Sequence, residues 1–202
     1  MIEWIQNFFS GAIPKLLLNA TLETLYMTFV STALAFILGL VLAIVLILTR
    51  RGGLCENRIV YAVLDVAINT LRSFPFIILL IVLFPLTKLL VGASIGTTAA
   101  IVPLTIGSAP FIARLIESAL LEVDSGVIEA AKSFGASKTQ IIFRVMFVEA
   151  LPSIIGAITL TLIVIIGFTA MAGTVGGGGL GDVAIRYGFQ RFRPDIMAYT
   201  VV

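Results

Sequence analysis

Residues 24–49 read TLYMTFVSTALAFILGLVLAIVLILT, an uncharged run that ends at the basic pair Arg50-Arg51. As an α-helix this run would reach about 39 Å, more than the hydrocarbon core of a bilayer, which is roughly 30 Å thick. Of the 202 residues in the chain, 59% are hydrophobic and 12% are charged, whereas soluble domains carry about 25% charged residues. The sequence therefore predicts an all-α integral membrane protein.

We expect the whole chain, residues 1–202, to form a single transmembrane domain. Its apolar runs predict spans at about residues 22–49, 59–90, 94–118 and 150–173. Asp65, Asn69 and Arg72 precede Pro75 in the second of these runs, so we expect a kinked helix there. A fifth run opens at residue 195 and stops at residue 202, so we expect an incomplete fifth span and a native protein that continues beyond it.

The first residues lack the basic start and the cleavage site of a secretory signal. Gln6, Asn7 and Pro14 interrupt the apolar pattern between residues 4 and 18, which predicts an interfacial helix rather than a span. The loop at residues 50–58 and the loop at residues 114–149 hold more Lys and Arg than the opposite side, so the positive-inside rule places both loops in the cytoplasm.

Composition also excludes several classes of function. The net charge of +2 comes from scattered residues and gives no basic face for nucleic acid. With Cys55 as the lone cysteine and no histidine, zinc chemistry and Ser-His or Cys-His catalysis are excluded. No Gly-x-x-x-x-Gly-Lys-Ser/Thr loop occurs, so any ATP that drives this protein must be hydrolysed on another polypeptide.

The cytoplasmic stretch Glu129-Ala130-Ala131-Lys132-Ser133-Phe134-Gly135, within a loop at about residues 121–144, has the pattern of two short helices meeting at a glycine. Asp124 or Ser125 can cap the first helix, and Gly135 suits the left-handed residue that ends it. Ser137 and Gln140 fit a capping box for the second helix. The pattern alone fits either a helical hairpin on the membrane surface or a projection that binds a partner.

Glu129, Ala130, Ala131 and Gly135 form a Glu-Ala-Ala-x-x-x-Gly motif that resembles the signature of bacterial ABC importer permeases. The resemblance implies that these four residues contact an ATP-hydrolysing subunit through a coupling helix. The family pattern continues with Ile-x-Leu-Pro ten residues after the glycine, where this chain has residues 145–148, VMFV. Leu151-Pro152 lies four residues later, so we expect the outgoing helix to run a turn further before it bends.

Four other stretches are similar to the methionine-uptake permeases: residues 69–77 (NTLRSFPFI), 101–105 (IVPLT), 109–114 (APFIAR) and 178–181 (GGLG). This resemblance implies a five-span bundle of the type I importer fold. It also implies a homodimer in the bacterial cytoplasmic (inner) membrane, with two ATP-binding subunits on the cytoplasmic face. ATP and Mg would then reside on those subunits and no cofactor on this chain, while an extracytoplasmic substrate-binding protein would deliver the cargo.

The function implied by the resemblance is import of D- or L-methionine, or of related amino acids, by alternating access. An ion-gradient-driven transporter is the alternative from another class, but the uncharged cores of the first, third and fourth spans leave only Asp65 as a membrane carboxylate. A membrane enzyme is disfavoured because the chain lacks histidine and any convergent carboxylate pair. A permease for another amino acid or small solute stays open.

Several further residues are candidates for the transport path. Met171 lies among small residues and either packs there or forms an adaptable plug across the pore. Arg72, with Asn69, is a candidate contact for a substrate carboxylate, although Arg72 could instead cap carbonyls or pair with Asp65.

The segment after the fourth span is the candidate docking surface for the binding protein. Gly176-x-Gly178-x-x-Gly181 formally matches a dinucleotide fingerprint, but no strand precedes it, so we expect a tight turn at the outer mouth. The candidate docking residues are Gly178, Gly179, Arg186 and Arg191.

Overall fold

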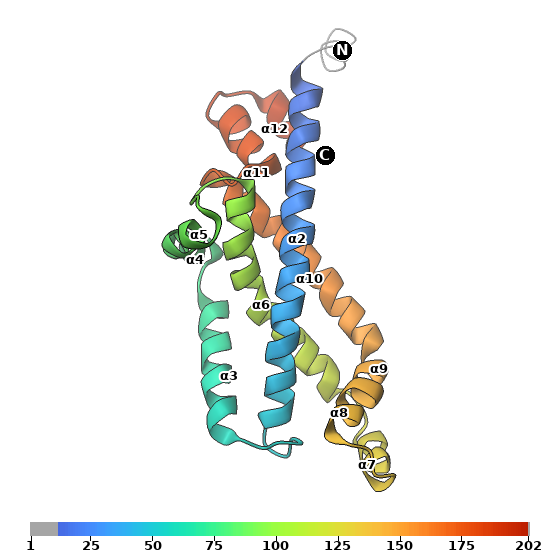
Figure 1. The fold of residues 1–202 in the computed structure, drawn as a ribbon. Coiled ribbons are helices and arrows are strands. Elements are labelled where there is room, and N and C mark those ends of the chain that lie inside the picture. The colour runs from blue at the N-terminus through green and yellow to red at the C-terminus, as the bar shows by residue number, and fades with distance from the viewer. Residues whose placement is uncertain (1–11, 202) are drawn as a thin grey trace. The chain divides into compact units, whose positions relative to one another are not determined.

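The computed structural model describes residues 12–201 (Figure 1). These residues form two compact units. Among the described residues, unit 1 comprises 12–31, 75–105 and 162–201, and unit 2 comprises 32–74 and 106–161. Every regular element in the described part of the chain is helical. The expected all-α fold is therefore confirmed.

Three helical stretches in the described chain are long and apolar enough to cross a membrane: Ile13–Thr49, Thr97–Leu121 and Leu151–Phe189. The bent pair Arg58–Ser73 and Phe76–Val82 adds a fourth if it forms one span. Large apolar side chains such as Phe29, Ile37 and Ile163 are exposed along these helices. Such surfaces suit lipid rather than water.

Unit 1 contains the first part of α2 (Ala12–Thr49), the first part of α6 (Thr97–Leu121) and the end of α10 (Leu151–Thr174). Its shorter helices are α4 (Phe76–Val82), α5 (Phe84–Val91), α11 (Gly179–Val183), the π-helical η2 (Ala184–Phe189) and α12 (Pro194–Val201). Met27, Leu104 and Ile165 are fully buried in its main core, where the rings of Phe76 and Phe168 stack at 4.2 Å.

Unit 2 contains the second part of α2, α3 (Arg58–Ser73), the end of α6 and the start of α10. Between α6 and α10 lie α7 (Ser125–Ser133), α8 (Lys138–Gln140), the π-helical η1 (Ile141–Met146) and α9 (Phe147–Glu149). The larger core cluster includes Ile112, Ile116 and Ile141. A Cβ atom at Gly39 of α2 would lie 2.2 Å from Ile112 Cγ2 and 3.0 Å from the Ala109 carbonyl oxygen, so α2 and α6 pack closely there.

Two expected elements differ from the structure. The second apolar run is not one kinked helix, because α3 ends at Ser73 and α4 begins only after Pro75; a proline N–H cannot join the helical ladder, and the residue before it avoids helical geometry. Residues 12–18 are the first turns of α2 rather than part of a separate helix, and the earlier part of the expected interfacial helix lies outside the described residues.

The expected helix after the cytoplasmic loop does run further than the family pattern. It continues through η1 and α9 to Glu149, and α10 then begins at Leu151-Pro152. Proline is tolerated at this position because the first turn of a helix leaves its N–H groups unpaired. The C-terminal element, α12, covers Pro194–Val201.

Candidate functional site: the cytoplasmic elbow

The elbow of unit 2, which the sequence predicts to lie on the cytoplasmic side, consists of α7, α8 and the turn between them. Asp124 caps α7, since its carboxylate accepts a hydrogen bond from the Gly126 N–H at 2.6 Å. Gly135 follows α7 with a φ of +78°, a backbone conformation that favours glycine. Ser137 and Gln140 form the reciprocal capping box of α8. The local signals in the sequence therefore predicted this element correctly.

The four motif residues lie on the elbow with different exposures. Glu129, Ala130 and Gly135 are exposed, whereas Ala131 is half-buried and packs against the larger core cluster. No residue of α7 is fully buried. The helix therefore presents most of its surface outward and is held to unit 2 chiefly by Ile128 and Ala131.

Phe134 is the most exposed large apolar residue of the elbow, at 92% of its possible area. It is the C-cap residue of α7, which ends at Ser133, and it directly precedes Gly135. An aromatic ring in water at the tip of a projecting turn is an unfavourable arrangement unless another surface covers it. Phe134 could not be identified from the sequence, because the motif does not determine whether its side chain is exposed.

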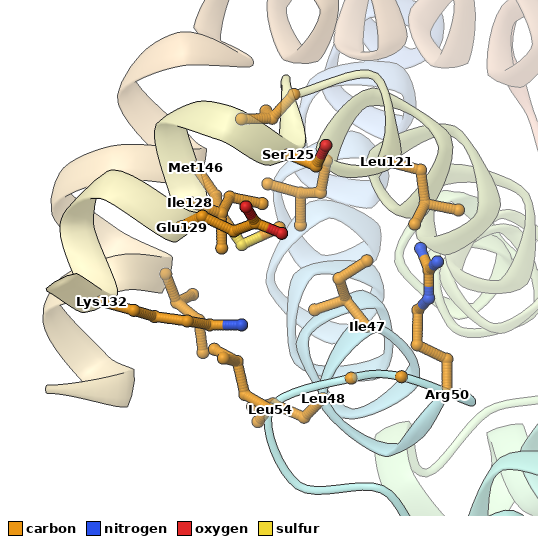
Figure 2. A pocket seen from close by; sticks show the side chains of 15 residues that line it. Ile47, Leu48, Arg50, Leu54, Leu121, Ser125, Ile128, Glu129, Lys132 and Met146 are labelled. Atoms are coloured by element: carbon orange, nitrogen blue, oxygen red, sulfur yellow. The ribbon is translucent and has the colours of Figure 1, made fainter.

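A cavity of about 280 Å³ lies between α7 and the end of α2, entirely within unit 2 (Figure 2). Ile47, Leu120 and Met146 contribute apolar lining, while Glu129, Lys132 and Arg50 contribute charges. Figure 2 shows Glu129 and Lys132 extending from α7 into this space, with Arg50 entering from the end of α2. Part of the elbow therefore lies over open space rather than over a packed core.

A network of charged side chains joins α3 to α6 in unit 2. Arg114 forms ion pairs with Asp65 and, at 2.7 Å, with Glu117. The Tyr61 hydroxyl lies 3.5 Å from Glu117 Oε1 and donates to it. The side chains of Glu117 and Arg114 are 5% and 17% exposed, so these two charges are largely buried, whereas the Asp65 side chain is 36% exposed.

This network corrects two sequence-based expectations. Asp65 pairs with Arg114, not with Arg72, which forms no ion pair among the described residues. The third span is also not free of carboxylates, because Glu117 lies within α6. A useful signal was present: Arg114 and Glu117 are three residues apart in an apolar helix, and charged residues in such helices normally have partners.

The glycine turn of unit 1, residues 176–181, is tight as expected. Gly176, Gly178 and Gly179 all have φ values between +76° and +87°. The Glu23 carboxylate accepts a hydrogen bond from the Gly179 N–H at 2.7 Å, and the Thr24 hydroxyl accepts one from the Leu180 N–H at 2.9 Å. Both bonds satisfy N–H groups at the start of α11, which have no helical partner.

The other candidate residues occupy separate places. Arg72 and Asn69 are exposed in the last turn and a half of α3. In unit 1, Met171 is 46% exposed near the end of α10. Arg186 pairs with Asp182 at 3.0 Å, and the guanidinium of Arg191 lies 4.6 Å from the centre of the Tyr187 ring. Gly178 is half-buried and Gly179 is buried.

Among residues 12–201, no group of three or more His, Cys, Asp or Glu side chains could hold a metal ion. The site consists of an exposed elbow on a partly hollow support, and of an ion pair and a hydrogen bond that join α6, the helix before the elbow, to α3.

Comparison with known proteins identifies the family to which this chain belongs. The family model described as "Binding-protein-dependent transport system inner membrane component" matches residues 37–202. A "Probable D-methionine transport system permease protein MetI" of Vibrio cholerae is 56% identical over 187 residues, which cover 93% of this chain and 83% of the relative. The "Methionine import system permease protein MetP" of Bacillus subtilis is 51% identical over 191 residues, which cover 95% of this chain and 86% of the relative.

A solved structure of the MetNI methionine ABC transporter in an inward-facing conformation contains a similar chain, with a TM-score of 0.93 and 45% identity. The match covers 95% of this chain and 89% of the solved one. The family model, which matches residues 37–202, extends over both the elbow and the glycine turn. The chain therefore belongs to the family of binding-protein-dependent transport system inner membrane components, the permeases of ABC importers.

Proposed function

We propose that this chain is the permease subunit of an ATP-driven importer that carries methionine across the bacterial inner membrane. The observation that carries the proposal is the cytoplasmic elbow, with its Glu129-Ala130-Ala131 motif and the exposed Phe134, in a chain about half identical to methionine permeases over most of its length. ATP is hydrolysed on a separate subunit. This chain provides the membrane path and receives the motion.

The partner contact follows from the shape of the elbow. Glu129, Ala130, Ala131 and Gly135 form the docking surface for an ATP-binding subunit, and Phe134 is its aromatic anchor. Small residues let another backbone approach closely, while an aromatic ring that becomes buried on binding supplies much of the binding energy. Two copies of this chain, each with one ATP-binding subunit, complete the transporter.

Transport proceeds by alternating access. Closure of the two ATP-binding subunits around ATP moves the two elbows, and the paired permeases then open outward. An extracytoplasmic binding protein delivers the amino acid at this stage, and hydrolysis returns the permeases to the inward-open state. Each step needs a mechanical link between the elbow and the helices that line the path.

The transport path itself is assigned from exposure and chemistry. Met171 is a pore gate, because its flexible thioether is half-exposed beside the buried residues Ala172 and Gly173. Arg72 and Asn69 contact the substrate, because Arg72 is an exposed guanidinium without an ion-pair partner in the described chain. Replacing Met171 with Ala should raise the uncoupled leak, and replacing Arg72 with Met should raise the KM for uptake.

Docking of the binding protein is assigned to the surface after α10. Positive charge on this surface comes from Arg186 and Arg191, and partly exposed backbone comes from Gly178. The turn is held by the hydrogen bond from the Gly179 N–H to Glu23. Replacing Arg191 with Glu should reduce the ATPase stimulation caused by the binding protein. The same reversal at Arg58, in the cytoplasmic loop, should leave that stimulation unchanged.

The decisive experiment joins the chain to its ATP-binding subunit in lipid vesicles and measures uptake of labelled D- and L-methionine. Uptake should require ATP on the cytoplasmic face and should persist when ion gradients are dissipated. Uptake that runs without ATP, on an ion gradient alone, would overturn the proposal. Uptake of another amino acid in preference to both enantiomers would overturn the cargo but not the permease role.

Phe134→Ala tests the docking surface directly. Loss of an aromatic anchor typically costs about 2 kcal/mol or more of binding free energy, which corresponds to a roughly 30-fold weaker complex. Leu89→Ala is the matched control, because Leu89 is a large apolar residue exposed to 81% on α5 of unit 1. Equal affinity of both variants for the ATP-binding subunit would remove Phe134 from the docking surface.

A further inference from the structure

The polar network between α3 and α6 has the form of a register lock. Tyr61 and Asp65 are four residues apart on α3, and Arg114 and Glu117 are three apart on α6, so each pair lies on one helix face. Tyr61 meets Glu117, and Asp65 meets Arg114. A shift of one helix past the other by one turn would break both contacts together.

Burying the charges of this network carries a large desolvation free energy, which opposes the attraction between the two helices. The side chains of Arg114 and Glu117 are 17% and 5% exposed, and two carboxylates share one guanidinium. The desolvation of buried charges can cancel their attraction, so apolar residues of similar size often hold helices equally well. Apolar contacts already exist nearby, where Ile68, Ala113 and Leu46 form a buried cluster. The attraction between opposite charges therefore does not explain why charged residues lie between α3 and α6. A requirement to fix the register of α3 against α6 does explain it.

The lock lies immediately before the elbow in the chain. Arg114 is about two helical turns, and Glu117 about one turn, from the end of α6 at Leu121. Asp124, the cap of α7, follows after two further residues. With so short a connection, a displacement of α7 must move the end of α6.

We propose that Arg114 is a positioning residue that makes α3 follow α6 when the elbow moves. The inference rests on the proposed function, since it needs an ATP-binding subunit that moves α7. Through its ion pair with Asp65, Arg114 converts displacement of the end of α6 into an equal displacement of α3, the helix that carries Asn69 and Arg72. Its ion pair with Glu117, on α6 itself, holds the guanidinium in place. Without the lock, α6 slides along α3, and ATP is hydrolysed without opening the path.

The test compares four variants of the whole complex in vesicles, measuring both ATP hydrolysis and the amount of methionine imported per ATP. The first is Arg114→Met, and the second is the neutral combination of Arg114→Met, Asp65→Asn and Glu117→Gln. Arg114→Lys keeps the charge. Arg58→Met is the matched control, because it breaks an exposed pair between the first residue of α3 and Glu56 in the preceding loop.

In the first two variants, hydrolysis should stay near the wild-type rate while methionine imported per ATP falls by about tenfold or more, the size of an ordinary coupling free energy. Arg114→Lys should restore part of this ratio, and Arg58→Met should leave it unchanged. If Arg114→Met prevents assembly, the neutral combination decides, because it leaves no unpaired buried charge. Wild-type import per ATP in the neutral combination would overturn the inference.

Failure of the inference and failure of the proposed function give different results. If the wild-type complex shows no ATP-driven uptake, the function itself is wrong. If the wild type and the neutral combination transport equally well per ATP, the importer stands and only the role of Arg114 is lost.

Discussion

The glycine turn of unit 1 and the Arg114 network of unit 2 both join segments that are far apart in the chain, but with different chemistry. In the glycine turn, carboxylate and hydroxyl groups of Glu23 and Thr24 accept hydrogen bonds from backbone N–H groups 156 residues away. In the network, one guanidinium joins two carboxylates, and its ion pair with Asp65 spans 49 residues.

The difference concerns what each junction can tolerate. At Gly181 a Cβ atom would lie 2.5 Å from the Ala170 carbonyl oxygen, and at Gly173 it would lie 2.4 Å from the Asp182 nitrogen, so the glycine turn depends on the absence of side chains. The Arg114 network depends on the presence of side chains and on their charges. Substitutions that add side-chain volume should therefore destabilise the glycine turn. Substitutions that remove a charge should destabilise the Arg114 network.

Arg114→Met, alone, should produce the largest loss of stability. It leaves Asp65 and the buried Glu117 without their cation, and breaking a buried ion pair in this way typically costs about 3–5 kcal/mol. Arg58→Met, which breaks a pair whose side chains are 74% and 40% exposed, should cost far less, because water screens exposed charges. The free energy of unfolding in detergent, followed by circular dichroism, measures both, and equal losses would contradict the distinction.

Gly173→Ala should come next, because its added methyl group meets backbone atoms of Gly181 and Asp182 that cannot rotate away. Overpacking of this kind costs about 1–3 kcal/mol. Gly167→Ala on the same helix is the control, since no atom lies within 4 Å of its Cβ position and alanine has the higher helix propensity. The unfolding temperature of Gly173→Ala should be lower than that of the wild type. The unfolding temperature of Gly167→Ala should be equal to it or higher.

The elements that sequence patterns predicted are those whose partners are neighbours in the chain. The Asp124 cap, Gly135 and the Ser137–Gln140 capping box all act over two to four residues, so the elbow was predicted with its ends. The break at Pro75 was placed correctly but underestimated, because the sequence does not show whether neighbouring helices hold such a helix together.

What the sequence did not reveal depends on tertiary contacts. Nothing near Glu23 indicates that its carboxylate caps α11, and nothing near Asp65 distinguishes Arg114 from Arg72 as its partner. Phe134 was equally hidden, because a phenylalanine among Ala, Lys and Ser can be buried or exposed. The contacts of the glycine turn and of the Arg114 network could therefore be identified only from the structure, although the sequence shows that the turn is rich in glycine.

Glu23→Ala should have a smaller effect than either of the first two changes. It removes the acceptor for the Gly179 N–H at the start of α11, and loss of an N-terminal cap typically costs about 0.5–2 kcal/mol. Glu23→Gln retains an oxygen acceptor and should cost less. If hydrogen exchange at Gly179 is equally fast in the wild type and in Glu23→Ala, the capping role is wrong.

The smallest effect concerns Glu56, an exposed carboxylate in the loop between α2 and α3, which contrasts with the buried Glu117 of the Arg114 network. Hydrogen bonds from the Gly52 N–H and then from Arg58 lower the pKa of Glu56 below its ordinary value of 4.5. The ionised form is therefore favoured in the folded loop, and the contact with Gly52 should be complete above pH 4.5 and lost as the pH falls through the lowered pKa. Hydrogen exchange at Gly52, corrected for its intrinsic pH dependence, should accelerate in that acidic range.

Glu56→Gln is the matched control for this titration, because its amide oxygen accepts the Gly52 hydrogen bond but carries no charge at any pH. Exchange at Gly52 in this variant should follow the intrinsic pH dependence alone. Since Glu56 is solvent-exposed, its protonation should lower the unfolding temperature only slightly, whereas replacing the buried Glu117 should lower it strongly. An equally large drop on protonation of Glu56 would mean that the loop supports unit 2 as strongly as the buried network does.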